Sequence, residues 1–132
     1  MDTYIAIVGS RGFDDYALLC DSIDEYIKSL EPYVVNVTIV SGGAAGADTL
    51  AERYADEYNY KKLIFLAEWK KYGRAAGMVR NKDIINAADT VIAFWDGKSK
   101  GTKNSIDLAK RAKIQPIVIM YNGKNKSELE QL

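Results

Sequence analysis

Histidine is absent from this chain of 132 residues. A chain without imidazole has no histidine general base, no Ser-His or Cys-His nucleophile pair and no ordinary zinc ligand set. This absence excludes large classes of hydrolase and metalloenzyme. We therefore expect no bound metal and no required cofactor, and any catalysis must rest on carboxylate, arginine, lysine or tyrosine side chains or on the backbone.

Cysteine and long apolar runs are also scarce. The single cysteine, Cys20, has no partner for an internal disulfide, and it falls on the apolar face of a predicted helix, where we expect it to fill the core. No apolar run reaches the roughly 18 to 20 residues of a membrane span, and the N-terminus lacks the basic start and small-residue cleavage site of a secretory signal. We expect a cytoplasmic protein that does not enter a membrane.

Net charge is lacking too, because 18 Lys and Arg residues balance 18 Asp and Glu residues. The balance hides an asymmetry: residues 1–60 carry 11 acidic and 3 basic side chains, and residues 61–132 carry 7 acidic and 15 basic ones. The basic half could face a polyanion. In a folded domain the two halves interleave, however, so the asymmetry can equally reflect attraction between neighbouring helices.

The sequence does contain a regular alternation of short apolar runs with helical patterns. Its length and balanced composition suit one compact domain over residues 1–121, followed by a polar C-terminal tail at residues 122–132. Residues 67–77 have no clean period and predict a long functional loop. The apolar runs predict strands at residues 4–8, 36–41, 62–66, 90–94 and 116–120, and the helical spacing predicts helices at residues 14–30, 47–58, 78–87 and 102–112.

This alternation predicts the α/β class, because right-handed βαβ units place successive strands parallel, with helices on both faces of the sheet. We expect a Rossmann-like three-layer α/β/α sandwich whose five-stranded parallel sheet has the order 3-2-1-4-5. Ligands bind such sheets at the carboxyl ends of the strands, beside the point where the strand order reverses. Here that point lies between the first and fourth strands.

The turn after the second predicted strand is built from very small side chains, with the sequence Ser-Gly-Gly-Ala-Ala-Gly-Ala-Asp at residues 41–48. Its glycines can adopt unusual backbone angles, and peptide N–H groups at the start of the next helix can approach an anion closely. A phosphate group is the expected guest. A short connection packed tightly against a sheet also favours small residues, so this turn alone does not decide between the two explanations.

Three further turns, at residues 9–11, 69–81 and 95–102, also follow predicted strands and should lie at the same edge of the sheet. Three aromatic residues in them, Trp69, Tyr72 and Trp95, are candidates for stacking on a base, or are lid or core aromatics. The residues that we predict to bind a ligand and its phosphate groups are Gly9, Ser10, Arg11, Ser41, Gly42, Gly43, Ala44, Gly46, Asp48, Arg80, Asn81, Gly101 and Thr102.

Two charged residues in these turns have alternative roles. Arg11 directly follows the first strand, where its planar guanidinium can hold two phosphate oxygens. It could instead form a structural ion pair with Asp14, Asp15 or Asp48. Asp48 lies close to the start of a helix, where the dipole stabilises a carboxylate. A phosphate beside it would be repelled, so we expect Asp48 to contact a ribose hydroxyl or Arg11.

Taken together, these motifs resemble those of the SLOG superfamily, named for the Smf/DprA and Lonely Guy proteins, and within it the small YspA/YpsA-like group. The resemblance covers about residues 4–120. It rests on Gly-Ser-Arg at residues 9–11, the glycine-rich turn at 41–48, Ala-Gly-Met-Val-Arg-Asn at 76–81, and Gly-Thr at 101–102. It implies a Rossmann-like fold that binds nucleotides or nucleotide-derived ligands, commonly as a homodimer, with phosphate groups over the glycine-rich turns.

The chain departs from the Lonely Guy enzymes at one position. Those enzymes cleave the bond between base and ribose phosphate, and they carry a catalytic glutamate in the motif Pro-Gly-Gly-x-Gly-Thr-x-x-Glu. Aligning Gly101 and Thr102 with this motif places Ser105 at the glutamate position. Arg80 falls on the arginine of their Met-x-x-Arg motif, so the resemblance implies that anion binding is retained.

The sequence therefore favours a cytoplasmic domain that binds or senses a small-molecule nucleotide, without strong catalysis of its own. One alternative is an enzyme that acts on a nucleotide or its N-glycosidic bond, with Asp48, Asp89 or Asp96 replacing the missing glutamate. Another is a DprA-like accessory protein that binds nucleic acid through the basic second half of the chain.

Overall fold

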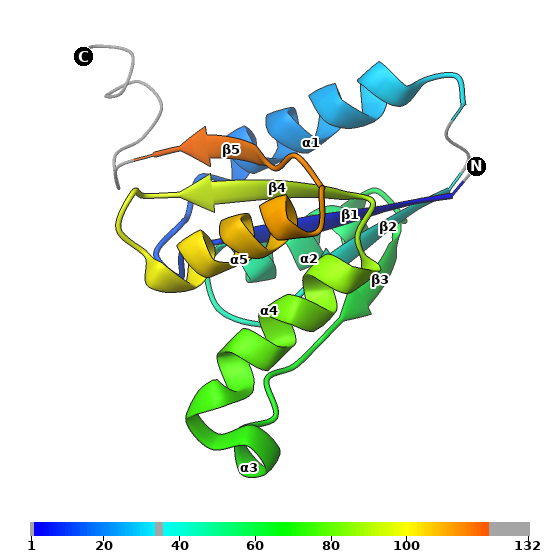
Figure 1. The fold of residues 1–132 in the computed structure, drawn as a ribbon. Coiled ribbons are helices and arrows are strands. Elements are labelled where there is room, and N and C mark those ends of the chain that lie inside the picture. Colours follow the sequence, from blue (N-terminus) through cyan, green and yellow to red (C-terminus); the bar gives the residue numbers. More distant parts are fainter. Residues whose placement is uncertain (1, 34–35, 122–132) are drawn as a thin grey trace.

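The computed structural model describes residues 2–33 and 36–121, and its centre is a five-stranded parallel sheet (Figure 1). The strand order β3-β2-β1-β4-β5 confirms the predicted α/β architecture. The polar tail predicted for residues 122–132 lies outside the described residues. The strands are β1 (Asp2–Gly9), β2 (Asn36–Ser41), β3 (Lys61–Ile64), β4 (Thr90–Trp95) and β5 (Ile117–Met120).

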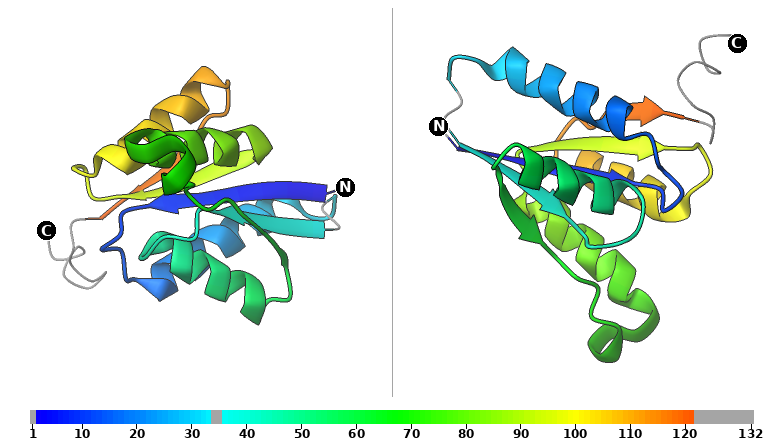
Figure 2. Two further views of the ribbon diagram at one scale, coloured as in Figure 1. Left: turned by 90° about the horizontal axis from the view of Figure 1, so that it is seen from below. Right: turned by 180° about the vertical axis from the view of Figure 1, so that it is seen from behind.

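Helices cover both faces of this sheet (Figure 2). Helices α1 (Tyr16–Leu30) and α2 (Ala47–Glu57) pack on one face, and α4 (Ala76–Ala87) and α5 (Lys100–Arg111) pack on the other. The arrangement is the three-layer sandwich that the alternating pattern predicts. None of the helices in the described residues is long and apolar enough to cross a membrane.

The central strand β1 shows why its sequence is an almost unbroken apolar run. Successive side chains of a strand point to opposite faces of the sheet. Ile5 and Ile7 belong to the core under α1 and α2, whereas Ala6 and Val8 belong to the core under α4 and α5. Both faces of β1 are therefore buried. Cys20 of α1 packs against the first of these cores and is partly buried.

The segment after β3 differs from the prediction. β3 ends at Ile64 rather than at residue 66, because its only neighbour, β2, ends at Ser41, which pairs with Ile64. The predicted loop at residues 67–77 contains α3 (Trp69–Tyr72) and a 3-10 turn, η1 (Gly73–Ala75). These elements are too short to give a helical period.

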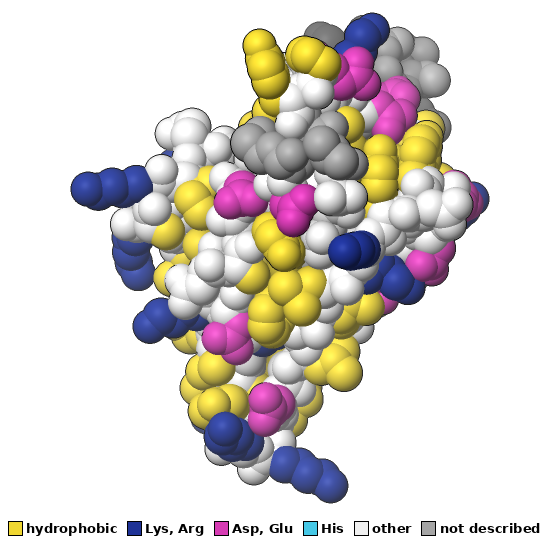
Figure 3. Space-filling model, turned by 90° about the vertical axis from the view of Figure 1, so that its right-hand side faces the viewer, with side chains coloured by type: hydrophobic (Ala, Val, Ile, Leu, Met, Phe, Trp, Pro, Cys, Tyr) yellow, Lys and Arg dark blue, Asp and Glu magenta, His cyan; other side chains and the backbone are white. Residues whose placement is uncertain are grey.

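We call this segment, α3 together with η1, the arm. It projects from the sandwich beside the start of α4 (Figures 1 and 2). At the lower end of the molecule in Figure 3, where α3 lies, hydrophobic side chains lie next to Lys or Arg side chains, with acidic ones between them. The arm exposes two aromatic side chains, Trp69 and Tyr72, and its basic residues are exposed as well.

The start of α2 is in direct contact with the turn between β1 and α1. Gly46, the residue before α2, has a φ of +79°, and a Cβ added there would lie 2.4 Å from the carbonyl oxygen of Ser10 and 2.5 Å from that of Arg11. The N–H group of Ala47 donates to the same Ser10 oxygen at 3.4 Å. Only glycine fits this contact, which holds two of the motif turns together at the carboxyl edge of the sheet.

We predict that Gly46→Ala destabilises the protein. The left-handed backbone alone should lower the free energy of unfolding by roughly 1–3 kcal/mol, and the contact with the Ser10 and Arg11 carbonyls should add to this loss. Urea unfolding followed by circular dichroism measures the change. Gly12→Ala is the matched control, because no heavy atom lies within 4 Å of a Cβ added there, and its effect should stay within about 0.5 kcal/mol. Equal effects of the two variants would contradict the close contact.

Candidate functional site

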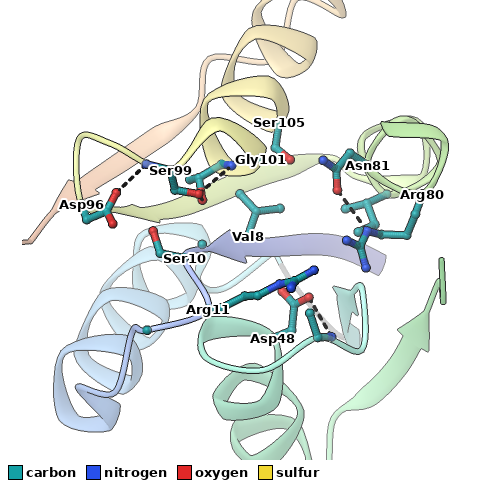
Figure 4. A pocket seen from close by; sticks show the side chains of 15 residues that line it. Val8, Ser10, Arg11, Asp48, Arg80, Asn81, Asp96, Ser99, Gly101 and Ser105 are labelled. Atoms are coloured by element: carbon teal, nitrogen blue, oxygen red, sulfur yellow. Dashed lines mark hydrogen bonds between the residues drawn. The ribbon is translucent and has the colours of Figure 1, made fainter. Parts of the chain in front are cut away.

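Two adjoining cavities open at the carboxyl edge of the sheet, with volumes of about 400 Å³ and 370 Å³. Arg11, Ala44 and Arg80 line both of them. Most of the residues predicted from the sequence therefore come together. The predicted residues that line only the first cavity (Figure 4) are Gly9, Ser10, Asp48, Asn81, Gly101 and Thr102, and those that line only the second are Gly42, Gly43 and Trp69.

Four predicted residues line neither cavity. The hydroxyl of Ser41 is buried and donates to Glu52 Oε2 at 3.0 Å. Gly46 serves the contact between α2 and the β1–α1 turn described above. Tyr72 lies on the arm, and Trp95 packs against the core under α4 and α5 while its indole N–H donates to the carbonyl oxygen of Ser99 at 3.0 Å. Trp95 thus supports the β4–α5 turn.

The N-terminus of α5 faces the first cavity through a turn that its own side chains fix. Ser99 is the N-cap, and its Oγ accepts the backbone N–H of Thr102 at 3.3 Å. Asp96 Oδ1 accepts the backbone N–H groups of Lys98 at 2.9 Å and Ser99 at 2.8 Å. These two N–H groups, and to a lesser extent the nearby Ser10 hydroxyl, hold the pKa of Asp96 below its ordinary value. Asp96 is therefore an ionised carboxylate at neutral pH.

Ser10 carries a buried hydroxyl without a partner. The residue is 5% exposed, and within residues 2–33 and 36–121 no group forms a hydrogen bond with its Oγ. Figure 4 shows this oxygen directed toward the turn that holds Asp96. Buried polar groups in native proteins nearly always have a partner, and one left without any costs roughly 1–3 kcal/mol. The orphan hydroxyl indicates a position that a ligand atom can complete.

The two arginines of the site are held differently. Arg80 donates from Nη1 to the carbonyl oxygen of Gly42 at 2.8 Å and from Nε to Asn81 Oδ1 at 3.0 Å. A Cβ on Gly42 would lie 2.8 Å from Nη1, so this glycine leaves room for the guanidinium. Arg11 is exposed, and among the described residues it forms no ion pair with any aspartate. The structural ion pair considered for Arg11 is therefore not formed.

Asp48 is a buried carboxyl that lines the first cavity, and it is 8% exposed. Its Oδ2 accepts the backbone N–H of Ala44 at 3.1 Å. Burial raises the pKa of Asp48 to about 6, although the Ala44 N–H group and the positive charge of Arg80 act to lower it. The carboxyl therefore gains a proton within about one unit of neutral pH. Its charged neighbours are Arg80 and Glu52, and the negative charge of Glu52 also acts to raise the pKa of Asp48.

Some lining residues were not among those predicted to bind a ligand. The sequence suggests Asp96 only as a substitute for the Lonely Guy glutamate, and it places Ser105 at the position of that glutamate. Asp89, another suggested substitute, lies outside the cavities at the opposite end of the sheet, where its Oδ2 accepts the Tyr4 N–H at 2.8 Å. Ser99 could have been found as an N-cap three residues before Thr102. Leu66 gave no signal, because its exposure depends on where β3 ends. The other lining residues are Val8, Gly12, Ala45, Ala67 and Ile84.

Solved structures of two DNA processing proteins share this fold. DprA from Streptococcus pneumoniae superposes with a TM-score of 0.68 at 20% identity, over 98% of this chain and 56% of that one. DprA from Helicobacter pylori superposes with a TM-score of 0.66 at 21% identity, over 98% of this chain and 72% of that one. The chain thus spans little more than half of the pneumococcal protein, and at these identities the likeness shows the fold alone.

Sequence comparison identifies the family. The Gene 61 protein of Mycobacterium phage D29 is 35% identical over 121 residues, which cover 86% of this chain and 93% of that protein. Translation initiation factor IF-2 of Campylobacter hominis is 26% identical over 131 residues, which cover 93% of this chain but 14% of the factor. Residues 3–72 match the family described as YAcAr: YspA, cpYpsA-related SLOG family. The chain therefore belongs to the YspA, cpYpsA-related SLOG family.

Proposed function

We propose that this protein binds a nucleotide or nucleotide-derived ligand across its two adjoining cavities. The observation that carries the proposal is that the cavities differ in character yet share Arg11, Ala44 and Arg80. The first is polar and faces the N-terminus of α5, and the second has an apolar side formed by Leu66 and Trp69. A ligand with an anionic end and a flat apolar end, such as a nucleotide, matches this pair of cavities.

The first cavity takes the phosphate end in this proposal. The N-terminus of α5 carries the positive end of the helix dipole, which favours an anion. The unpartnered Ser10 hydroxyl offers a donor within the same cavity. Arg11 adds a guanidinium that no protein carboxylate in the described residues occupies. These groups come from two different turns, the β1–α1 turn and the β4–α5 turn, so a phosphate would be contacted from two sides.

The second cavity takes the base. Leu66 is 67% exposed and Trp69 is 55% exposed, and both side chains line this cavity. Gly42 and Gly43 line the same cavity, where they make room for the side chains of Arg80 and Leu66 respectively. Stacking of a base on an aromatic ring contributes about 1–3 kcal/mol. A base stacked on Trp69 would cover part of this exposed apolar surface.

We propose binding without cleavage of the N-glycosidic bond. Ser105, at the position of the Lonely Guy glutamate, is buried and lines the first cavity. A serine hydroxyl without a neighbouring base cannot exchange a proton at neutral pH or balance a developing positive charge as a carboxylate does. Asp48 and Asp96 also line this cavity, so they are the residues to replace if base release is ever observed.

A second candidate function is binding of single-stranded nucleic acid by the arm. The DprA of Helicobacter pylori, which shares the fold, binds single-stranded DNA. The arm exposes Trp69 and Tyr72 next to Lys70, Lys71 and Arg74, which is the combination of aromatic and basic groups that binds such strands. The Lys71 ammonium lies 5.1 Å from the centre of the Tyr72 ring.

Truncating the two arginines tests the leading proposal. Arg11→Ala should weaken nucleotide binding about tenfold to a hundredfold, because a charge-assisted hydrogen bond contributes roughly 1.5–3 kcal/mol. Its melting temperature should not change, since Arg11 is exposed and has no carboxylate partner among the described residues. Arg80→Ala should weaken binding and also lower the melting temperature, because it removes the hydrogen bonds to Gly42 and Asn81.

Calorimetric titration of a panel of nucleoside mono-, di- and triphosphates, beside thermal melts, measures both effects. Arg11→Lys is the matched control, because lysine keeps the positive charge but cannot form the bidentate hydrogen bonds of a guanidinium. This variant should bind nucleotides with intermediate affinity. Wild-type affinity in Arg11→Ala for every nucleotide would contradict the phosphate contact.

The buried Asp48 gives a prediction for stability against pH. Its folded pKa, about 6, lies above its ordinary value of 3.8. Folding therefore takes up a proton between these values, and the stability that is present below about pH 4 is lost as the pH rises through 6. Asp48→Asn removes this loss and keeps an acceptor for the Ala44 N–H group. The variant should be more stable than the wild type by roughly 1–3 kcal/mol at pH 8 and equal to it near pH 4.

Urea unfolding at a series of pH values measures this difference. Asp48→Ala separates the two effects, because it removes the charge together with the acceptor for Ala44. A stability difference between Asp48→Asn and the wild type that stays constant from pH 4 to pH 8 would show that the carboxyl is not perturbed by burial.

Fluorescence anisotropy with a labelled single-stranded oligonucleotide tests the second candidate. Electrostatic binding predicts that the logarithm of the affinity falls linearly with the logarithm of the salt concentration. Replacing Lys70 and Lys71 together by alanine should weaken binding and flatten this slope, and Trp69→Ala should weaken binding without changing it. An affinity that these variants leave unchanged would remove the arm from consideration.

A further inference from the structure

The phosphate end of the site contains an uncompensated negative charge. Asp96 lines the first cavity, and it uses Oδ1 for two backbone N–H groups. No Lys or Arg in the described part of the chain forms an ion pair with it. A phosphate placed at the N-terminus of α5 would therefore face a carboxylate that has no counter-ion.

The Ser10 hydroxyl, which lies near Asp96 and Tyr121, is a second observation at the same end of the cavity. It is 5% exposed and has no hydrogen-bond partner among the described residues. Figure 4 shows that Ser10 and Asp96 approach this end from different turns, with their oxygens on facing sides. A buried hydroxyl oxygen and a carboxylate oxygen thus lie next to the space in which the phosphates are proposed to bind.

This pair of oxygens has the chemistry of a partial site for a hard divalent cation. Mg²⁺ is bound in proteins through one or two carboxylates together with substrate phosphates, and a Ser or Thr hydroxyl serves as a further ligand in phosphate-binding loops. The described residues contain no group of three His, Cys, Asp or Glu side chains that could hold a metal ion without such help. The cation would therefore arrive with the ligand.

We propose that this site takes its ligand as the complex of a divalent cation, Mg²⁺, with a nucleoside di- or triphosphate, and that Asp96 and Ser10 hold the cation. The proposal rests on the nucleotide site proposed above and names its ligand class. Two adjacent phosphate groups chelate Mg²⁺, whereas a single one does so poorly. With only two protein oxygens available, the ligand must supply this chelation, so a monophosphate should bind more weakly and gain little from Mg²⁺.

Calorimetric titration with ADP, in excess MgCl₂ and in EDTA, tests the proposal on the full chain. In the wild type, Mg²⁺ should tighten ADP binding roughly tenfold to a hundredfold, the scale of one charge-assisted contact. Asp96→Asn keeps the Oδ1 acceptor for the β4–α5 turn but lacks the charge, and it should lose this gain. Ser10→Ala should lose part of it. Asp89→Asn is the matched control, because it changes the same chemical group at the opposite end of the sheet, and it should keep the full gain.

A second measurement does not depend on how well the variants fold. Mn²⁺ADP added to the wild-type protein should broaden the backbone amide NMR signals of Ser10, Asp96 and Ser99 before those of Asp89, because paramagnetic broadening falls steeply with distance from the ion. Broadening confined to other residues would overturn the placement of the cation.

The outcomes separate this inference from the function on which it rests. ADP that binds equally well in EDTA and in MgCl₂ would overturn the cation site and leave nucleotide binding intact. A gain from Mg²⁺ that persists in Asp96→Asn would overturn the role of Asp96. If neither ADP nor any other nucleotide binds under either condition, the proposed function fails and the cation site fails with it.

Discussion

The contact between the start of α2 and the β1–α1 turn is the constraint on which the rest of the site depends. At Gly46 the backbone of one turn lies against the carbonyl groups of Ser10 and Arg11 in the other. Gly9 allows a second close approach, because a Cβ there would lie 2.6 Å from the Cβ of Ala47. These contacts fix the turns after β1 and β2 to one another. The residues that each turn carries, Arg11 and Asp48 among them, can therefore line one cavity.

Charge balance within this cavity determines what it can bind. Two arginines and two aspartates line it; Arg80 already donates to Gly42 and Asn81, whereas Arg11 forms no ion pair among the described residues. The aspartates differ: burial raises the pKa of Asp48 to about 6, whereas backbone N–H groups lower the pKa of Asp96. In the proposed complex, Asp48 would be neutralised by a proton, and the negative charge of Asp96 would be balanced by the proposed cation.

The sequence was sufficient to predict the strand order and the edge of the sheet where the motif turns meet, because alternating strands and helices allow few topologies. It could not show what each small residue accommodates. Gly42 leaves room for Arg80, and Gly46 for the β1–α1 turn, so part of the glycine-rich turn serves packing within the protein. The arm, the orphan Ser10 hydroxyl and the inward position of Trp95 depend on contacts between residues far apart in the chain, which no local pattern records.

The central claim is that one ligand spans both cavities, and an NMR titration of the labelled protein with a nucleotide tests it most directly. We predict that the amide signals of Ser10, Gly101 and Thr102 in the first cavity and the indole N–H signal of Trp69 in the second shift together, with one dissociation constant. The indole N–H signal of Trp95 should shift less, because it is bonded to Ser99 within the protein. Shifts that leave either cavity unaffected, or that follow two different dissociation constants, would contradict a single ligand spanning both.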